Sequence, residues 1–574
     1  MQPKRRIITD GVLSAIVLRR VAPASTVMGR RRWSDWRGLC FVLSDKLLGG
    51  RYPALVSKLH ELNALRAQIA QKSLAVPDSQ GLEVHQQRLM EWTTRKERLE
   101  VELARQIPEL NLARQLQAAS GETIIQALPR STALVEFVRF YTCDFHALRA
   151  QGESKWKATH YAAFVLSAEK PDSVQLFDLG EADEIDEMIA RFRESITNET
   201  ESAAPRQLKL APLPPYSSVS ASNGDRLRRV IFDSLRSALK DCKRLFLAPD
   251  GDLARLPFEV LPTEDGSLLI EQYQISYLTT GRDVLRFKLE SSGQPTSSLV
   301  LADPDFDLSE SSALSPGAAL QPGPQSRQSR DLDRSSLHFA RLPGTRKEGE
   351  TIAALLGVQP LLGEAALESQ LKARCSPRIL HIATHGFFLP DQRLLPSKQV
   401  LDVRPIAGEA NNKLEWFLGQ QVENPLLRSG LALAGANTWN RGGSLPLEAE
   451  DGLLTAEDVS VLDLLETELV VLSACETGLG QVHVGEGVFG LRRAFVVAGA
   501  RTLVMSLWKI PDTHTQELME EFYSHLLEGR SRVDALRAAQ LTMREKHPQP
   551  FYWGAFICQG DPAPLPPYQS GTLP

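Results

Sequence analysis

Apolar residues recur at helical spacing over residues 53–118. The positions on either side of Pro77 repeat three or four residues apart, or at sums of those steps, with charged residues between them. They are Leu55, Leu59, Leu62, Ile69, Leu89, Trp92, Leu99, Leu103 and Ile107. This pattern predicts two amphipathic helices joined by a short loop, an αα-hairpin.

Beyond residue 120 the pattern changes to short apolar runs rich in β-branched and aromatic residues. After a short helix over Thr123–Leu128, such runs predict strands. These are Leu134–Phe140, Tyr161–Leu166, Val174–Phe177, Arg244–Ala248, Ile275–Thr279 and Leu299–Ala302. Helices are expected between them at about 182–198 and 224–241.

From residue 345 onward, strands and helices alternate regularly. Three continuous apolar runs predict buried strands: Ile379–Ala383, Leu469–Leu472 and Thr502–Leu507. Helices are predicted at 345–356, 364–373, 485–498, 513–528 and 531–546, and residues 390–465 are expected to be a loop region with one helix. Strands that are apolar throughout and separated by helices indicate an α/β fold with a mostly parallel sheet covered on both faces. Ligands of such sheets bind outside the carboxyl ends of the strands.

Three segments fall outside this pattern. Residues 1–52 have no clear period, and 307–336 are rich in Ser, Pro, Gly and charge, which predicts a disordered insert. Residues 563–574 form a Pro-rich tail. We therefore expect a basic N-terminal segment (1–52), a helical hairpin (53–118) and one large domain (120–562).

Charge is unevenly distributed along the 574 residues. The net charge is −5, yet residues 1–52 hold eleven Lys/Arg against three Asp/Glu, about +8, which leaves about −13 for the rest. An acidic bulk argues against nucleic-acid binding. The apolar run Gly11–Leu18 is short, is closed by Arg19 and Arg20, and lacks a convincing small-residue cleavage site, which argues against a secretion signal. No stretch approaches the roughly 20 apolar residues of a membrane span, so we expect a cytoplasmic protein.

The six cysteines are scattered singly, with no CxxC pair. This argues against a disulfide scaffold and against a cysteine-rich zinc module. It is compatible with a reactive thiol in a reducing compartment.

Two strand ends carry residues with candidate chemistry. Cys475 follows the run Leu469–Leu472 and precedes a glycine turn, and His385 follows Ile379–Ala383 and precedes Gly386. An imidazole beside a thiol is the minimal base for cysteine nucleophilic catalysis. The backbone N–H groups of Gly386 and Cys475 are then candidates for an oxyanion hole. The alternative interpretation is a core cysteine and a structural histidine.

Two other motifs are less informative. His381 and His385 are four residues apart, but the glutamate of HExxH is absent and the segment is a strand, so His381 is interpreted as a packing residue and no metal is expected. Gly485, Gly487 and Gly490 match GxGxxG, but the preceding strand ends about ten residues earlier and no acidic residue follows at the required distance.

At these residues the chain resembles a known family. HIATHGFF (381–388) and VVLSACETGLG (470–480) are similar to the paired motifs of CHAT domains, caspase-like cysteine peptidases related to separase, gingipain and the caspases. LAPDGDLARLPFEVLP (247–262), DGLLTAEDV (451–459) and FYWGAFICQGD (551–561) fit the same family. The resemblance covers roughly 120–562 and implies a caspase-like sheet made of a pseudo-caspase half and an active half.

The resemblance also implies roles for individual residues. Cys475 would be the nucleophile, His385 the general base and then the acid, and Gly386 N–H an oxyanion donor, with no third triad member and no cofactor. The strand with Ser506 and Trp508 would line the pocket for the residue before the scissile bond (P1). Several relatives use an acidic residue there for a basic P1 side chain. Asp512 and Asp451 are candidates for it, although Asp512 is equally a helix N-cap, so P1 preference stays open.

The function expected is therefore a cysteine endopeptidase, of bacterial type, that cleaves a protein substrate and is controlled by a partner or stress signal. The alternative is a catalytically silent scaffold with a peptidase fold. CHAT proteins often carry upstream tetratricopeptide repeats, and only the hairpin and the basic segment precede the domain here. Self-processing in the loops at 324–341 and 390–450 is a minor possibility. The sequence names neither the substrate nor the oligomeric state.

Overall fold

The computed structural model describes residues 52–74, 82–104, 106, 116, 119–143, 156–197, 218–288, 293–309, 338–388, 425–476 and 486–567. The predictions for residues 1–51, for most of the 307–336 insert and for the end of the Pro-rich tail lie outside these ranges.

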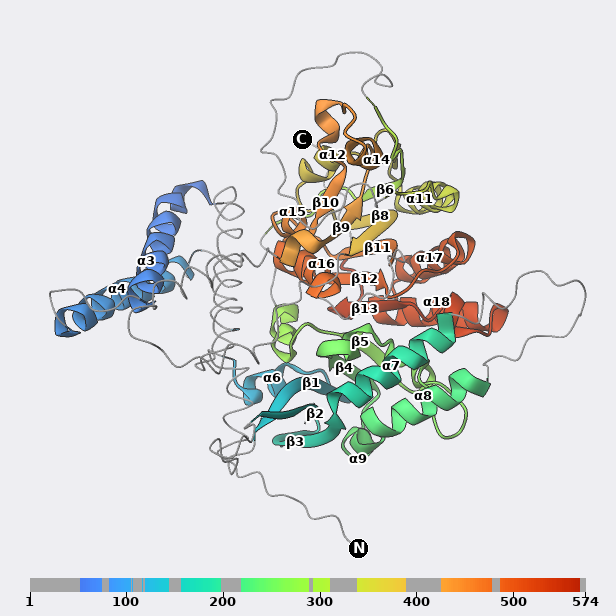
Figure 1. Cartoon of the computed structure of the whole chain (residues 1–574), viewed down its shortest axis with the longest axis horizontal. Helices are drawn as coiled ribbons and strands as arrows, with labels where there is room; N and C mark the ends of the chain where they lie inside the picture. Colours follow the sequence, from blue (N-terminus) through green and yellow to red (C-terminus); the bar gives the residue numbers. More distant parts are fainter. Residues whose placement is uncertain are drawn as a thin grey trace, which may run out of the picture.

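The two helices predicted over 53–118 are present as α3 (Val56–Leu74) and α4 (Leu82–Ala104). They form their own apolar cluster, made of Leu59, Leu62, Leu65, Leu99 and Leu103. Lys58 pairs with Glu102, and Arg95 with Glu61, across the hairpin. Figure 1 shows the hairpin to one side of a large sheet.

The sheet consists of two parallel blocks joined by one antiparallel pair. The first block contains β1 (Thr132–Cys143), β4 (Arg244–Ala248), β5 (Gln274–Tyr277) and β13 (Phe556–Gly560). The second contains β6 (Leu299–Pro304), β8 (Ile379–Phe388), β11 (Leu469–Glu476) and β12 (Thr502–Ser506). The antiparallel pairing of β12 with β13 joins them.

Antiparallel strands close both edges of this sheet. At one edge β2 (Trp156–Ser167) and β3 (Lys170–Glu181) continue from β1. At the other, β9 (Ser429–Ala432) and β10 (Leu453–Thr455) continue from β8. The short strand β7 (Leu361–Gly363) is an exception, because it pairs in parallel with β6.

Helices cover both faces, as expected for apolar strands. On one face lie α7 (Ala182–Thr197), α8 (Ser218–Ile231), α11 (Pro343–Leu356), α17 (Asp512–Leu527) and α18 (Arg532–Lys546) (Figure 1). On the other lie α6 (Gly121–Ala127), α15 (Ala456–Ser460) and α16 (Glu486–Ala498). Shorter helices are α9 (Arg236–Leu239), α10 (Leu269–Gln272), α12 (Glu368–Lys372) and α14 (Ala436–Asn440). The α/β fold with a mostly parallel sheet is thus confirmed.

The structure corrects three details of the predicted elements. The region 390–465 is more than a loop with one helix, because its described part contains β9, α14, β10 and α15. The strand β13 was not predicted. The strands β8 and β11 continue past their apolar runs, because backbone pairing persists: Cys475 and Glu476 stay in register with His385 and Gly386. His385 and Cys475 therefore lie within strands and not after them.

A buried arginine ties α18 to the sheet. The Arg532 side chain is 1% exposed; it pairs with Glu468 and donates a 2.9 Å hydrogen bond from Nη1 to the Ala563 carbonyl. Asp561 lies 3.9 Å from the same nitrogen. Without Arg532, Glu468 would keep, among the described residues, an ion pair only with the partly exposed Arg501, 3.3 Å away, and would lose its buried partner.

We therefore expect Arg532→Leu to lower the free energy of unfolding by about 3 kcal/mol in urea titrations. The matched control is Arg530→Leu, because the Arg530 side chain is 48% exposed and pairs with Glu528. Its effect should stay within about 1 kcal/mol. Equal effects of the two substitutions would contradict the assignment.

Candidate active site

The sheet brings Cys475 and His385 together. Their Cα atoms are direct partners in the parallel register of β11 and β8, and Gly386 pairs with Glu476 one position further. Adjacent strands lie about 4.8 Å apart. The description of Cys475 is confined to its backbone. Two motifs about 90 residues apart in sequence thus meet at one edge, because both strands run in the same direction.

The His385 ring is enclosed by aromatic side chains. Its side chain is 6% exposed and lies between Phe306 and Phe339, with ring centroids 5.5 and 5.8 Å away. Nε2 is 2.7 Å from the carbonyl oxygen of Ala340. A carbonyl only accepts hydrogen bonds, so Nε2 carries the proton and Nδ1 keeps the lone pair. Nδ1 is buried and has no hydrogen-bond partner among the described residues. This fixed tautomer leaves Nδ1 able to accept a proton.

The surroundings keep His385 neutral. Burial lowers the pKa of the imidazole and Lys509 lowers it further, whereas the Ala340 carbonyl and Asp512 oppose the shift. The net direction is downward from the ordinary value of about 6.5. At neutral pH the ring is therefore an unprotonated base.

This shift has a kinetic consequence. Since a lowered pKa preserves the neutral base to lower pH, kcat/KM should keep its maximum down to below about pH 6.5. The measurement is the pH profile of kcat/KM, which reports ionisations of the free enzyme. An acidic limb centred above pH 6.5 would contradict this account of His385.

His381 is a packing residue. It is fully buried between α11 and α17, where Nδ1 lies 3.1 Å from the Tyr523 hydroxyl and Nε2 lies 3.2 Å from a carboxylate oxygen of Glu348. In the described part of the chain, no group of three or more His, Cys, Asp or Glu side chains has the geometry of a metal site.

Of the four predicted pocket residues, Ser506 and Trp508 lie together at the end of β12. The Ser506 hydroxyl donates to the Trp508 carbonyl at 2.6 Å. The Trp508 indole is buried and donates from Nε1 to the Phe551 carbonyl at 3.0 Å. The Arg193 guanidinium carbon lies 5.8 Å from the centre of its ring. Trp508 thus packs at the end of β12 as a buried structural residue.

The two acidic candidates lie apart from each other. Asp512 is the first residue of α17, and Pro511 is the N-cap, so the cap interpretation was wrong. Its charge still acts on His385. The carboxylate of Asp451 accepts a 2.8 Å hydrogen bond from Leu453 N–H, and its charge acts on Glu368 of α12.

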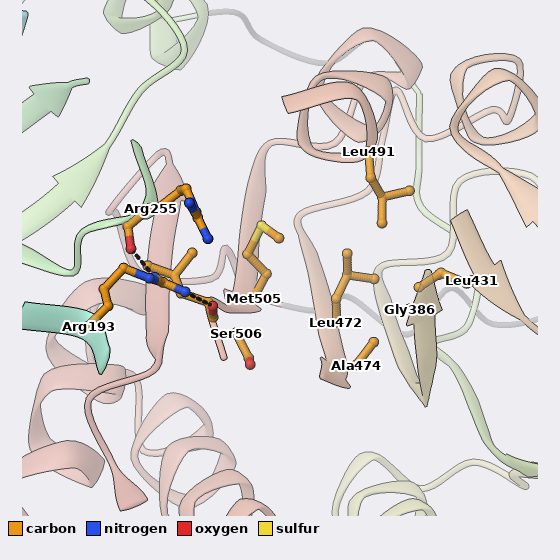
Figure 2. A pocket seen from close by; sticks show the side chains of 10 residues that line it. Arg193, Arg255, Gly386, Leu431, Leu472, Ala474, Leu491, Met505 and Ser506 are labelled. Atoms are coloured by element: carbon orange, nitrogen blue, oxygen red, sulfur yellow. Dashed lines mark hydrogen bonds between the residues drawn. The ribbon is translucent and has the colours of Figure 1, made fainter. Parts of the chain in front are cut away.

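A small pocket borders the two strands that carry the catalytic candidates. Gly386 borders it on one side and Ala474, the residue before Cys475, on another. Figure 2 shows apolar side chains along its walls and Arg193 and Arg255 at one end. Its lining comprises Arg193, Arg255, Gly386, Leu431, Leu472, Ala474, Leu491, Met505, Ser506 and Leu507, and includes neither Asp512 nor Asp451.

The sequence reasoning missed Ala340, Phe306 and Phe339, which hold the histidine, and both arginines of the cavity. Only Arg193 carried a signal. It falls in the apolar stripe of α7, four residues after Ile189 and three before Ile196, where a solvent-facing arginine is not expected.

A protein-family model matches most of the large domain of this chain. The CHAT domain model matches residues 222–561, more than half of the chain. The chain belongs to the CHAT domain family. The match starts at 222, whereas β1 to β3 of the same sheet and the helix α7 precede it, so the predicted start of the CHAT domain at 120 stays a prediction.

Two curated relatives are similar to part of this chain. Human tetratricopeptide repeat protein 28 is 28% identical over 331 residues, which cover 56% of this chain and 12% of that protein. The mouse protein of the same name is 29% identical over 231 residues, covering 39% and 9%. The chain thus spans only about an eighth or less of these relatives, and the predicted bacterial origin stays a prediction.

Solved structures also match at low identity. A separase–securin complex from Saccharomyces cerevisiae is 10% identical and covers 80% of this chain and 31% of that chain, with a TM-score of 0.38. The Arg-specific cysteine proteinase gingipain R is 10% identical and covers 67% and 75%, with a TM-score of 0.31. Separately, no helix in the described ranges has the length and apolar character needed to cross a membrane.

Proposed function

We propose that the chain is a cysteine endopeptidase that uses a dyad of Cys475 and His385. The observation that carries the proposal is the direct register of Cys475 with a histidine whose Nδ1 is unprotonated and whose Nε2 is held by a backbone carbonyl. A neutral imidazole beside a thiol supplies the base that cysteine nucleophiles need. Membership of the CHAT family supports the same chemistry.

The proposed reaction proceeds through an acyl-enzyme. Nδ1 of His385 takes the thiol proton, and the Cys475 sulfur forms a bond to the scissile carbonyl carbon, whose π electrons move to oxygen. The tetrahedral intermediate collapses, the C–N bond breaks, and the imidazolium gives its proton to the leaving amine. Water then hydrolyses the thioester with His385 again acting as base and then as acid, which regenerates the thiol.

The Ala340 carbonyl supports both stages. A second proton on the ring creates an imidazolium, and its Nε2–H stays hydrogen-bonded to Ala340 throughout. The ring therefore does not need to turn between accepting and donating the proton. The backbone N–H groups of Gly386 and Cys475 are the proposed oxyanion donors, at the edge of the sheet that borders the cavity.

A fluorogenic peptide library tests this function. Cleavage by the wild type and its absence with Cys475→Ala is the expected result. Equal cleavage by both proteins would overturn the assignment of the nucleophile. If neither cleaves and Cys475 also reacts no faster than an ordinary thiol, the chain is a binding module with a peptidase fold.

The substrate is proposed to be a protein, and a separate protein partner is proposed to control access to the site. The curated relatives are named for tetratricopeptide repeats, which fits control by a partner. A reducing compartment such as the cytoplasm is proposed as the location, because a catalytic thiol must stay reduced.

A further inference from the structure

The carbonyl that holds His385 belongs to an irregular segment, residues 338–341, between β6 and α11 in the chain. The Ala340 carbonyl oxygen of this segment is 2.7 Å from Nε2 of His385. Because the segment is neither a helix nor a strand, no regular backbone ladder fixes this carbonyl. Its position therefore depends on how its two neighbours, Phe339 and Arg341, are anchored.

The residue before Ala340 is anchored by a buried amide. Asn437 lies on α14 and is 1% exposed. Its Oδ1 accepts a 2.9 Å hydrogen bond from the Phe339 N–H, and its Nδ2 donates a 2.9 Å hydrogen bond to the Phe339 carbonyl. A single side chain thus holds both backbone polar groups of Phe339, as a neighbouring strand would.

The residue after Ala340 is anchored by a buried carboxylate. Asp303 is 1% exposed, and its two oxygens accept hydrogen bonds from Nε and Nη2 of Arg341 at 3.0 and 2.9 Å. A bidentate pair of this kind fixes direction as well as distance. The Arg341 side chain is itself 62% exposed, so it contributes little to the apolar core.

The backbone at Asp303 is shaped to present this carboxylate. In the pairing of β6 with β7 the register shifts between Ala302 and Pro304, which leaves Asp303 as the extra residue of a bulge. Its φ is 44°, in the left-handed region that residues other than glycine rarely adopt. Bulges next to a site re-aim a side chain, and strained backbone of this kind clusters at functional sites.

The two anchors matter because the Ala340 carbonyl determines the state of the proposed base. It keeps the proton on Nε2 of His385 and so leaves the Nδ1 lone pair available. It also favours the imidazolium, because it accepts a hydrogen bond from the charged ring. A carbonyl that moved away from the ring would lose both effects, although every reacting group would still be present.

We propose that the segment 338–341 is held by a clamp, made of Asn437, Asp303 and Arg341, that positions the carbonyl on which the catalytic base depends. The proposal rests on the proposed cysteine peptidase function and adds positioning residues to its dyad. The clamp acts on the reaction only through the Ala340 carbonyl.

The test compares Arg341→Ala with Arg346→Ala in the peptide cleavage assay. Nε of Arg346 donates to the same Asp303 carboxylate at 2.8 Å from α11, so each substitution removes one arginine and leaves the other. Only Arg341 is directly bonded to Ala340 in the chain. We expect Arg341→Ala to lower kcat about 10-fold with KM unchanged, the scale of one hydrogen bond, and Arg346→Ala to stay within about twofold.

The pH profile of kcat/KM separates positioning from charge. Removal of a cation near the ring raises the pKa of His385, whereas loss of the Ala340 hydrogen bond lowers it. Lys509 and Asp512, which also act on the ring, are the same in both proteins. The acidic limb of Arg341→Ala should therefore lie at lower pH than that of the wild type.

The outcomes separate the two proposals. An unchanged kcat in Arg341→Ala, or an acidic limb that stays or moves to higher pH, overturns the clamp and leaves the peptidase function standing. A raised KM with unchanged kcat also overturns it, because Arg341 would then contact the substrate. Equal losses in the two arginine variants, with equal falls in their thermal midpoints, would assign Arg341 to stability alone. If the wild type shows no cleavage that depends on Cys475, the peptidase function fails and the clamp with it.

Discussion

Replacing Cys475 with alanine is expected to abolish peptide cleavage, with kcat/KM falling by at least about 10⁴-fold. The Cys475 thiolate forms the covalent bond of the acyl-enzyme. Alanine at this position, directly opposite His385 in the register of β8 and β11, has no nucleophilic atom. The measurement is kcat/KM on the best peptide of the fluorogenic library. The thermal unfolding midpoint of Cys475→Ala is measured alongside. If it is unchanged, the loss of cleavage reflects lost chemistry and not lost folding.

The chain offers a matched control for this substitution. Cys375 is an exposed free cysteine that precedes β8 and lies outside the cavity lining. Cys375→Ala should retain the wild-type kcat/KM within about twofold, since surface substitutions are usually small perturbations. If Cys375→Ala lost activity while Cys475→Ala kept it, the nucleophile would be assigned to the wrong residue.

The second large effect is expected from His385→Gln, with a loss of about 10²–10⁴-fold in kcat/KM. The glutamine amide can still donate to the Ala340 carbonyl and fill most of the space between Phe306 and Phe339. It cannot accept the thiol proton. The fold should therefore survive while the reaction loses its base.

Two comparisons make this result specific. His160→Gln, on β2 far along the sheet from β8, should leave kcat/KM unchanged. The double variant Cys475→Ala with His385→Gln should be no worse than Cys475→Ala alone, because residues that act as a unit have non-additive effects. Full activity of His385→Gln would contradict its role as the base.

The fold was largely predictable because buried parallel strands are apolar on both faces. The runs Leu469–Leu472 and Thr502–Leu507 stood out for that reason, and β11 and β12 contain them. The same criterion failed for β9 and β10, which have only four and three residues and lie at one edge region of the sheet. It also failed for β13, where the apolar run is short because Gln559 and Gly560 end the strand.

The dyad was predictable for a related reason. Parallel strands end at a common edge, so a histidine and a cysteine that each follow an apolar run are brought together. The partners that tune His385 were not predictable, because Phe306 and Ala340 come from other parts of the chain, and Ala340 contributes only its backbone carbonyl. The two arginines of the pocket, Arg193 and Arg255, were not predicted. They lie in segments that connect strands of the first block of the sheet, far in sequence from Cys475 and His385.

The most direct test of the dyad needs no substrate. Wild-type protein is treated with limiting iodoacetamide at pH 7, and peptide mapping compares alkylation of Cys475 with that of exposed Cys375 in the same molecule. The account predicts that Cys475 reacts at least about 10-fold faster and that His385→Gln removes the difference, because a neighbouring base raises the thiolate fraction. A Cys475 that reacts no faster than Cys375, or one whose rate is unchanged in His385→Gln, would contradict the central claim.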